Sequence, residues 1–224
     1  GTASASDTLY HEIVSWKKRT GRPVVAHFEG LATSGAYYIA MASDEIVCHP
    51  SSVTGSIGVL FASLNFSGLM EKVGVQNQTI TGGKFKDVGS PLRPMEPHER
   101  EQLQGVIDDL WARFKSVVDD GRPNLDRERV DALADGRIYS ADQALGDGLV
   151  DRIGYLEDAV KLAEEKAGVE SSRVIMYHRP NEYRKNIYSR SALSRDGIEV
   201  SLVPGIDPLP SGFYYLWPAV LGDQ

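Results

Sequence analysis

The chain has 224 residues, of which 42% are hydrophobic and 25% charged, an ordinary composition for a domain that buries its own core. Its 24 basic and 31 acidic residues give a net charge of −7, which argues against bulk nucleic-acid binding because that function needs a basic face. The single cysteine, Cys48, excludes an internal disulfide framework and a zinc site built from cysteines.

The predicted elements begin with a helix that Asp7 caps and that runs to about Arg19. A buried strand over 23–28 follows, and a turn over 30–35 leads into a helix over 34–42. The rest of the pattern predicts a buried strand over 45–48 that holds Cys48, a glycine-punctuated segment over 53–61, a helix over 66–73, a strand over 75–80, a long helix over 97–119, helices over 126–134, 141–145 and 156–167, and a strand over 173–177.

The alternation of strands and helices predicts an α/β domain with a largely parallel sheet. The composition changes after His178, so we expect one domain over 1–178 and a tail or arm over 179–224. The tail ends in the apolar stretch 213–217, which we expect to pack on another surface. No apolar run approaches the ~20 residues that a membrane-spanning helix needs. No signal peptide opens the chain.

Ser34 is the first candidate for chemistry. It stands between a predicted strand and a predicted helix, and Gly35 and Ala36 follow it. Such a turn exposes the hydroxyl beside the free amides of a helix N-terminus, which can stabilise an oxyanion. A serine in this place is more often an ordinary helix cap. The hydrolase motif Gly-x-Ser-x-Gly is absent.

A serine nucleophile needs a base, and a lysine can act as one only when it is neutral, hence desolvated or beside another cation. Lys86 lies just past a predicted strand, where a tight turn can place it in a cleft, although a solvated loop lysine is the commoner case. Thr54 and Ser56 lie in a glycine-rich segment and can orient an ammonium group, or the segment is a plain turn. None of the five histidines has the sequence context of a catalytic triad. They are His11, His27, His49, His98 and His178.

Taken together, these segments resemble the signal peptide peptidase SppA family. The resemblance extends from Gly1 to about residue 168, three-quarters of the chain, and the tail after about His178 has no match. The motifs that carry it are Ser34–Ala40, Ser43–Asp44, Thr54–Val59, Gly83–Asp87, Ser90–Pro91, Glu99–Arg100, Asp135–Gly136–Arg137 with Tyr139, and Ala144 with Gly148–Asp151.

The resemblance implies a ClpP/crotonase-like fold and a Ser–Lys catalytic dyad. The family's nucleophile falls on Ser34 and its base on Lys86. Because the family's lysine follows an aromatic residue in a Gly-x-aromatic-Lys pattern, the match selects Lys86 over Lys84. A serine that holds the lysine ammonium falls on Ser56. We therefore expect Lys86 to be mostly buried and within hydrogen-bond reach of Ser34.

The resemblance also implies an oxyanion hole made of two backbone amides. One belongs to Gly35, and the other, from a glycine turn, falls on Gly1. The sequence departs from the family here, because the strands that should precede Gly1 are missing. We expect the sequence to be a piece of a longer protein, with an unpaired sheet edge at the strand over 24–28.

The function implied by the resemblance is that of a serine endopeptidase that degrades cleaved signal peptides or other apolar, membrane-derived peptides, with no metal and no cofactor. The same resemblance implies a homo-oligomeric ring with active sites near subunit borders, and no nucleic-acid partner. It also implies a bacterial cell-membrane location, with a membrane anchor upstream of Gly1 and the catalytic domain outside the cytoplasm.

Three alternatives stay open. One is a phage prohead-type protease with the same dyad, and another is a catalytically silent peptide-binding scaffold of the same fold. The third is a crotonase-type acyl-CoA enzyme, which would want an acidic pair where this sequence has Lys86.

Overall fold

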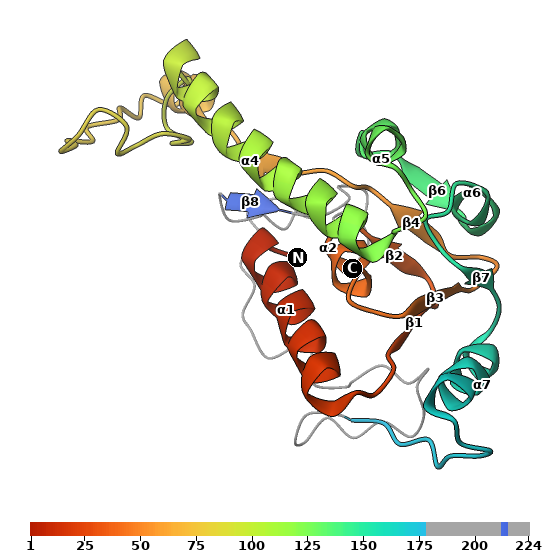
Figure 1. Ribbon diagram of the computed structural model, residues 1–224. Coiled ribbons are helices and arrows are strands. Elements are labelled where there is room, and N and C mark those ends of the chain that lie inside the picture. Colours follow the sequence, from red (N-terminus) through yellow and green to blue (C-terminus); the bar gives the residue numbers. More distant parts are fainter. Residues whose placement is uncertain (178–211, 215–224) are drawn as a thin grey trace.

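The structure is a computed structural model that describes residues 1–177 and 212–214 (Figure 1). The predicted tail over 179–224 lies outside the described residues, apart from the backbone of Gly212–Tyr214. The elements in chain order are α1 (Ala3–Thr20), β1 (Val25–Phe28), β2 (Leu31–Thr33), α2 (Gly35–Ala40), β3 (Glu45–Cys48), β4 (Val53–Gly55), β5 (Leu60–Ala62), α3 (Ser67–Lys72), α4 (Pro97–Gly121), α5 (Arg127–Leu133), β6 (Ile138–Ser140), α6 (Ala141–Gly146), β7 (Arg152–Ile153), α7 (Leu156–Ala167) and β8 (Gly212–Tyr214).

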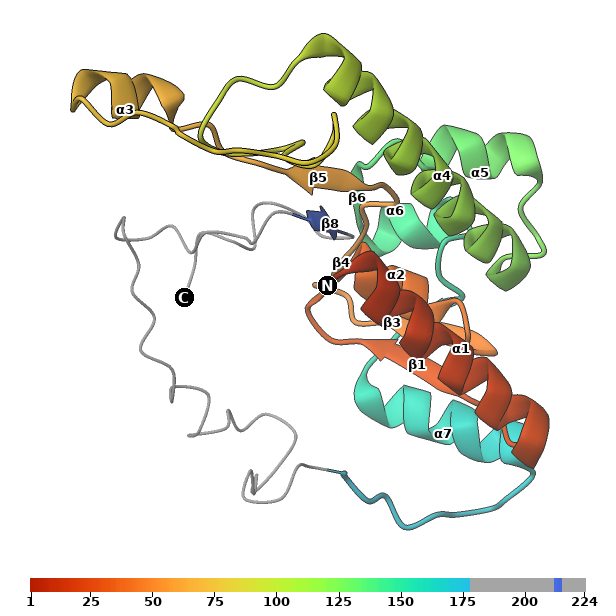
Figure 2. The ribbon, with the colours of Figure 1, turned by 90° about the vertical axis from the view of Figure 1, so that its left-hand side faces the viewer.

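The strands form short ladders that are mostly parallel. In the first sheet β3 lies between β1 and β7, and both of its pairings are parallel. In the second sheet, β4 pairs with β2 in parallel and with β6 antiparallel. A third, two-stranded sheet pairs β5 with β8 antiparallel. Helix α7 packs on β1 and β3, and α1 packs on α2 at the other side of these strands (Figure 2). The predicted α/β class, with a largely parallel sheet and flanking helices, is confirmed.

One edge of β1 has no partner strand among the described residues, as predicted for the strand over 24–28. An apolar groove follows this edge, and Ile13 from α1 and Ile39 from α2 form its far wall. Such an edge offers unpaired backbone groups to another extended segment. Of the helices that the structure describes, none combines the length and the apolar character that crossing a membrane requires.

Helix α4 connects the body of the molecule to a projecting arm, which we define as residues 63–96 (Figures 1 and 2). The helix begins at Pro97 with a capping box, in which Glu99 accepts the amide proton of Glu96 at 2.9 Å. Its apolar stripe buries Leu103 and Phe114, and the Phe114 ring lies 4.9 Å from that of Tyr38 in α2. This packing fixes α2, and with it the start of α2, against the core.

Four local predictions are wrong. Helix α1 begins at Ala3 because the Thr2 side chain caps it, and Asp7 instead pairs with Arg113 and accepts the Tyr38 hydroxyl. Strand β2 occupies residues 31–33 of the predicted turn over 30–35. The segments 75–80 and 173–177 are not strands, because the described chain offers them no ladder partner. By contrast, Cys48 lies buried in β3 as predicted, and α7 has the predicted bounds.

We predict that Tyr37→Phe lowers the free energy of unfolding by about 1–3 kcal/mol. The Tyr37 side chain is fully buried, and its hydroxyl donates to the carbonyl of Leu149 at 2.8 Å, so the substitution leaves that carbonyl without a donor. Urea denaturation followed by circular dichroism measures the change. The exposed Tyr155 provides a matched control, since Tyr155→Phe should leave stability unchanged. Equal effects of the two substitutions would contradict the prediction.

Candidate functional site

Ser34 occupies a strained turn between β2 and α2. Its backbone has φ +56° and ψ −113°, a left-handed conformation that is uncommon for a residue with a side chain. The residue is fully buried, and its Oγ has no hydrogen-bond partner among the described residues. The amide of Ser34 donates to the carbonyl of Gly55 at 2.7 Å, which holds the turn against the end of β4. A strained serine with an unpaired hydroxyl at a strand-to-helix turn is an arrangement typical of nucleophiles.

Ser56 lies directly beside this turn. The parallel register places Thr33 opposite Gly55, so Ser34 and Ser56 leave the ends of paired strands together. Ser56 is also buried and left-handed, with φ +52°, and its amide donates to the carbonyl of Arg137 at 2.7 Å. Gly55 between them has φ +85°, and the Tyr139 ring packs against its α-carbon. The structure thus brings two of the predicted site residues together.

The two predicted oxyanion glycines lie at the same end of the body. Gly35 is buried and begins α2, where the first amides of a helix have no acceptor within the helix itself. The chain begins at Gly1, just before α1, and its N-terminal end lies beside α2 in two perpendicular views (Figures 1 and 2). This placement is compatible with a shared site.

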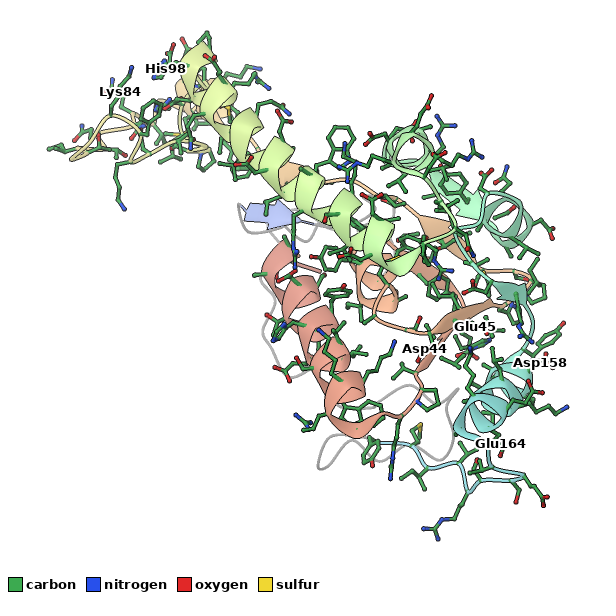
Figure 3. All side chains as sticks on the ribbon, in the orientation of Figure 1. Asp44, Glu45, Lys84, His98, Asp158 and Glu164 are labelled. Carbon is green, nitrogen blue, oxygen red and sulfur yellow. The ribbon has the colours of Figure 1, made fainter. Side chains whose placement is uncertain are left out.

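Lys86 lies elsewhere, in the arm. Its side chain is exposed, and the neighbouring Lys84 and His98 lie at the far end of the molecule from Glu164 (Figure 3). Because the Ser34 hydroxyl has no partner in the described part of the chain, the expected hydrogen bond to Lys86 is not formed, and the expectation of a mostly buried lysine is wrong for this chain. The physical reason is that the arm projects from the body and carries the lysine loop away from α2 (Figure 2).

The loop that carries Lys86 is nevertheless well anchored. Consecutive turns hold its backbone, in which the amide of Lys86 donates to Gly83 at 3.2 Å and that of Val88 to Phe85 at 3.3 Å. At its end, Gly89 is buried against the ring of Phe61 in β5. The loop is therefore a defined part of the arm with a fixed connection to β5.

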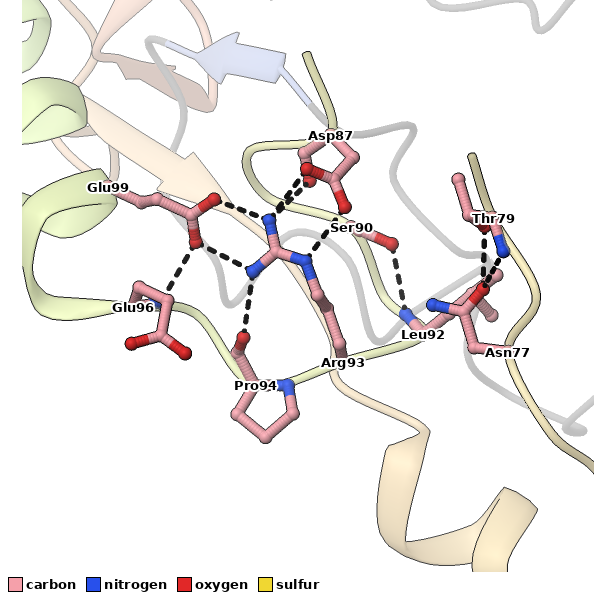
Figure 4. A network of polar contacts seen from close by, with 9 residues as sticks. All are labelled: Asn77, Thr79, Asp87, Ser90, Leu92, Arg93, Pro94, Glu96 and Glu99. Atoms are coloured by element: carbon pink, nitrogen blue, oxygen red, sulfur yellow. Dashed lines mark hydrogen bonds and ion pairs between the residues drawn. The ribbon is translucent and has the colours of Figure 1, made fainter. Parts of the chain in front are cut away.

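A cluster of three charged side chains, which we call the clamp, ties this loop to α4 (Figure 4). Arg93 grips the carboxylate of Asp87 with its Nε and Nη2, both at 2.8 Å, and donates from Nη1 to Glu99 at 2.8 Å. Glu99 is almost fully buried at the first turn of α4. The Arg93 guanidinium lowers the pKa of Asp87 and that of Glu99, the latter to about 2, so both carboxylates are ionised at neutral pH.

Sequence reasoning missed the clamp. In the sequence, Asp87 and Glu99 stand out only as members of family motifs, and Arg93 carries no signal of its own. The capping pattern of Glu96 and Glu99 ahead of the apolar stripe is readable, but the second partner of Glu99 depends on the turn that returns Arg93 to it.

One family model matches more than half of the chain. The sequence model of peptidase family S49 matches residues 16–170. The chain is 40% identical over 177 residues to a putative protease of Methanocaldococcus jannaschii, covering 79% of this chain and 56% of the relative. It is 41% identical over 174 residues to a putative protease of Synechocystis, covering 78% and 62%. It is 41% identical over 160 residues to a putative signal peptide peptidase SppA of Enterococcus faecium, covering 71% and 46%.

The chain thus spans between 46% and 62% of the length of these three relatives. Among solved structures, a mutant of a membrane-bound stomatin-specific protease matches with 12% identity and a TM-score of 0.40, covering 68% of this chain and 60% of that one. An enoyl-CoA hydratase from Thermoplasma volcanium matches with 16% identity and a TM-score of 0.38, covering 74% and 49%. Scores this low carry no argument, so the α/β class rests on the strand pairing itself.

We predict that Gly55→Ala destabilises the protein by about 1–3 kcal/mol, because the change combines a left-handed backbone with overpacking. A Cβ at this position would lie 2.4 Å from Cδ2 of Tyr139, at a φ of +85°. Chemical denaturation measures the effect. Gly105→Ala in α4 is the matched control, since a Cβ there meets nothing within 4 Å and alanine favours a helix. A Gly55→Ala variant as stable as the Gly105→Ala variant would refute the prediction.

Proposed function

The chain belongs to peptidase family S49, and from that premise we propose that it is a serine peptidase with Ser34 as nucleophile and Lys86 as general base. The observation that carries the proposal is Ser34 itself, a strained and buried serine at a strand-to-helix turn whose Oγ is unpaired in the described part of the chain. Strain of this kind persists only where the surrounding structure enforces it, and it concentrates at functional sites. The first residues of α2 supply backbone amides beside it.

The reaction follows from ordinary acyl-transfer chemistry. Neutral Lys86 takes the proton of the Ser34 hydroxyl, and Oγ attacks the peptide carbonyl to form a tetrahedral intermediate. The amide of Gly35 donates to the developing oxyanion, together with that of Gly1 when a preceding residue makes it a peptide amide. The protonated Lys86 then gives its proton to the leaving amine as the C–N bond breaks. Water, activated by the same lysine, hydrolyses the acyl-enzyme, and Ser56 orients the lysine ammonium throughout.

The substrates we propose are cleaved signal peptides or other apolar peptides released from membranes. Support comes from the Enterococcus faecium relative, whose name is putative signal peptide peptidase SppA. A location at the bacterial cell membrane, with the domain outside the cytoplasm, belongs to the same proposal. Nucleic acids are not among the proposed partners, because the net charge of −7 disfavours them.

We propose that the base comes from a second copy of the chain. Lys86 is exposed on a projecting arm, while Ser34 is buried in the body, and no described residue pairs with its Oγ. The arm also exposes large apolar side chains, a feature that marks protein–protein contacts on soluble proteins. Among them are Leu64, Phe66, Leu69, Val73, Val75 and Ile80. We therefore propose a closed homo-oligomer in which the arm of one copy carries Lys86 to Ser34 of its neighbour.

We predict that Ser34→Ala and Lys86→Ala each lower kcat/KM for a signal-peptide substrate by at least about 10⁴-fold, and that the double variant loses little more. The two groups act as one unit, so removing either ends the proton transfer. Activity of the unmodified enzyme should rise with pH, because only the unprotonated lysine is a base. A fluorophosphonate probe should label Ser34 in the unmodified protein.

Lys84→Ala is the matched control for this experiment, because its side chain lies in the same loop, over the Phe85 ring. It should reduce kcat/KM only slightly. An active Lys86→Ala variant together with an inactive Lys84→Ala variant would reassign the base. A protein that binds peptides but never cleaves them or reacts with the probe would be a silent scaffold.

A further prediction concerns how the copies assemble. Inactive Ser34→Ala oligomers still carry Lys86, and inactive Lys86→Ala oligomers still carry Ser34. When the two proteins are mixed, dissociated and reassembled, about a quarter of the sites should combine intact partners, and activity should return. Peptide cleavage and light scattering measure the result. If the mixture forms oligomers but stays inactive, the base comes from the same copy, and the arm must fold back onto its own body.

A further inference from the structure

The residues on both sides of Lys86 are fixed to the first turn of α4. On one side, the ring of Phe85 meets that of His98 edge to face, with centroids 5.4 Å apart. On the other, Asp87 is joined through Arg93 to Glu99. Lys86 itself remains exposed, so its backbone is held while its side chain is free to reach outward. This arrangement suits a side chain that acts on a group outside its own arm.

We propose that Arg93 is a positioning residue for Lys86, holding the lysine loop on α4 by bridging Asp87 and Glu99. The inference rests on the proposed function, since it assigns Arg93 a role in a reaction that Lys86 performs. Arg93 touches neither Ser34 nor a substrate in the proposal; it acts only through the loop.

The geometry requires an arginine. The guanidinium grips Asp87 with two nitrogens and at the same time donates to both oxygens of Glu99, with a further bond from Nη1 to the Pro94 carbonyl at 3.0 Å. A lysine in place of Arg93 offers one point charge and cannot keep two carboxylates in a fixed planar arrangement. Removing Glu99 would leave Arg93 on Asp87 but detach the pair from α4.

The clamp also affects the charge around the base. A carboxylate beside a lysine favours the ammonium form, which cannot act as a base. Arg93 engages the Asp87 carboxylate directly, and the amide of Glu96 at the positive end of α4 shares Glu99. The clamp therefore orders the loop, and it pairs the Asp87 carboxylate with Arg93 instead of leaving it to Lys86. The charged and titratable groups on the loop and on the elements packed against it are Lys84, Asp87, Arg93, Glu96, His98 and Glu99.

The test compares Arg93→Lys with the unmodified oligomer, using a fluorescent signal-peptide substrate. We expect kcat to fall roughly 10- to 100-fold, because a displaced base loses the geometry of proton transfer, while KM stays within about twofold. The rising limb of the pH–rate profile should move to higher pH, because a loosened lysine leaves the proposed contact with the neighbouring copy for water and comes under the influence of Asp87. Active sites are counted with a fluorophosphonate probe, and light scattering confirms the assembly.

The matched control is Arg129→Lys. Arg129 lies on α5 and forms an exposed ion pair with Asp147, which directly follows α6, and both residues lie outside the arm. The control substitution should leave kcat and the pH profile unchanged. If Arg93→Lys fails to fold or assemble, Glu99→Gln decides the matter, because it keeps Arg93 on Asp87 and removes only the charged anchor on α4. It should shift the pH profile in the same direction.

Two results would overturn the proposal. One is an Arg93→Lys enzyme with the kcat and pH profile of the unmodified protein. The other is a loss of kcat that disappears once active sites are counted, with no shift of the pH profile, because this indicates a structural role alone. Lys86→Ala, measured in parallel, separates the two hypotheses. If it is inactive, only the clamp has failed; if it is active, the proposed base has failed.

Discussion

The left-handed turn at Ser34 is the constraint on which the rest of the site depends. A residue with a side chain in this region costs about 1–3 kcal/mol and persists only when its surroundings leave no alternative. Here β2 pairs in parallel with β4, and the amide of Ser34 bonds to Gly55. On the other side of the turn, the rings of Tyr37 and Tyr38 are buried in the core. The strand before the turn and the helix after it are both held, so the serine cannot relax.

The same pairing explains why Ser56 accompanies Ser34. Two parallel strands that end at one level release their next residues side by side, and here both of those residues are buried, left-handed serines. Gly55 has to be a glycine because the Tyr139 ring occupies the space of a side chain. Ser34 and Ser56 are far apart in the sequence, and it is the strand register that places these two strained residues next to each other.

The sequence predicted the elements whose signals are local. The apolar stripe of α4 and the pattern of α7 placed those helices well. The place of Ser34 between a strand and a helix was also predicted, but its positive φ was not, and the expectation of an exposed hydroxyl was wrong because the residue is fully buried. The position of Lys86 was not, because it depends on how the arm projects from the body, and no local sequence pattern encodes that projection. The segment 75–80 shows the same limit, since a strand was predicted there but the described part of the arm offers it no partner.

The two halves of the proposed site are held by different forces. Ser34 is fixed by backbone pairing and by the packing of apolar side chains in the core. The loop of Lys86 is fixed in part by two carboxylates whose pKa values Arg93 lowers, that of Glu99 from 4.5 to about 2. Groups with a lowered folded-state pKa contribute stability above their ordinary pKa and lose it as the pH falls through the folded value. Between about pH 4.5 and pH 2, acid therefore weakens the attachment of the lysine loop while the turn of the serine keeps its bonds. The attachment of the lysine loop therefore depends on pH, whereas the turn at Ser34 is held by interactions that do not involve ionisable groups.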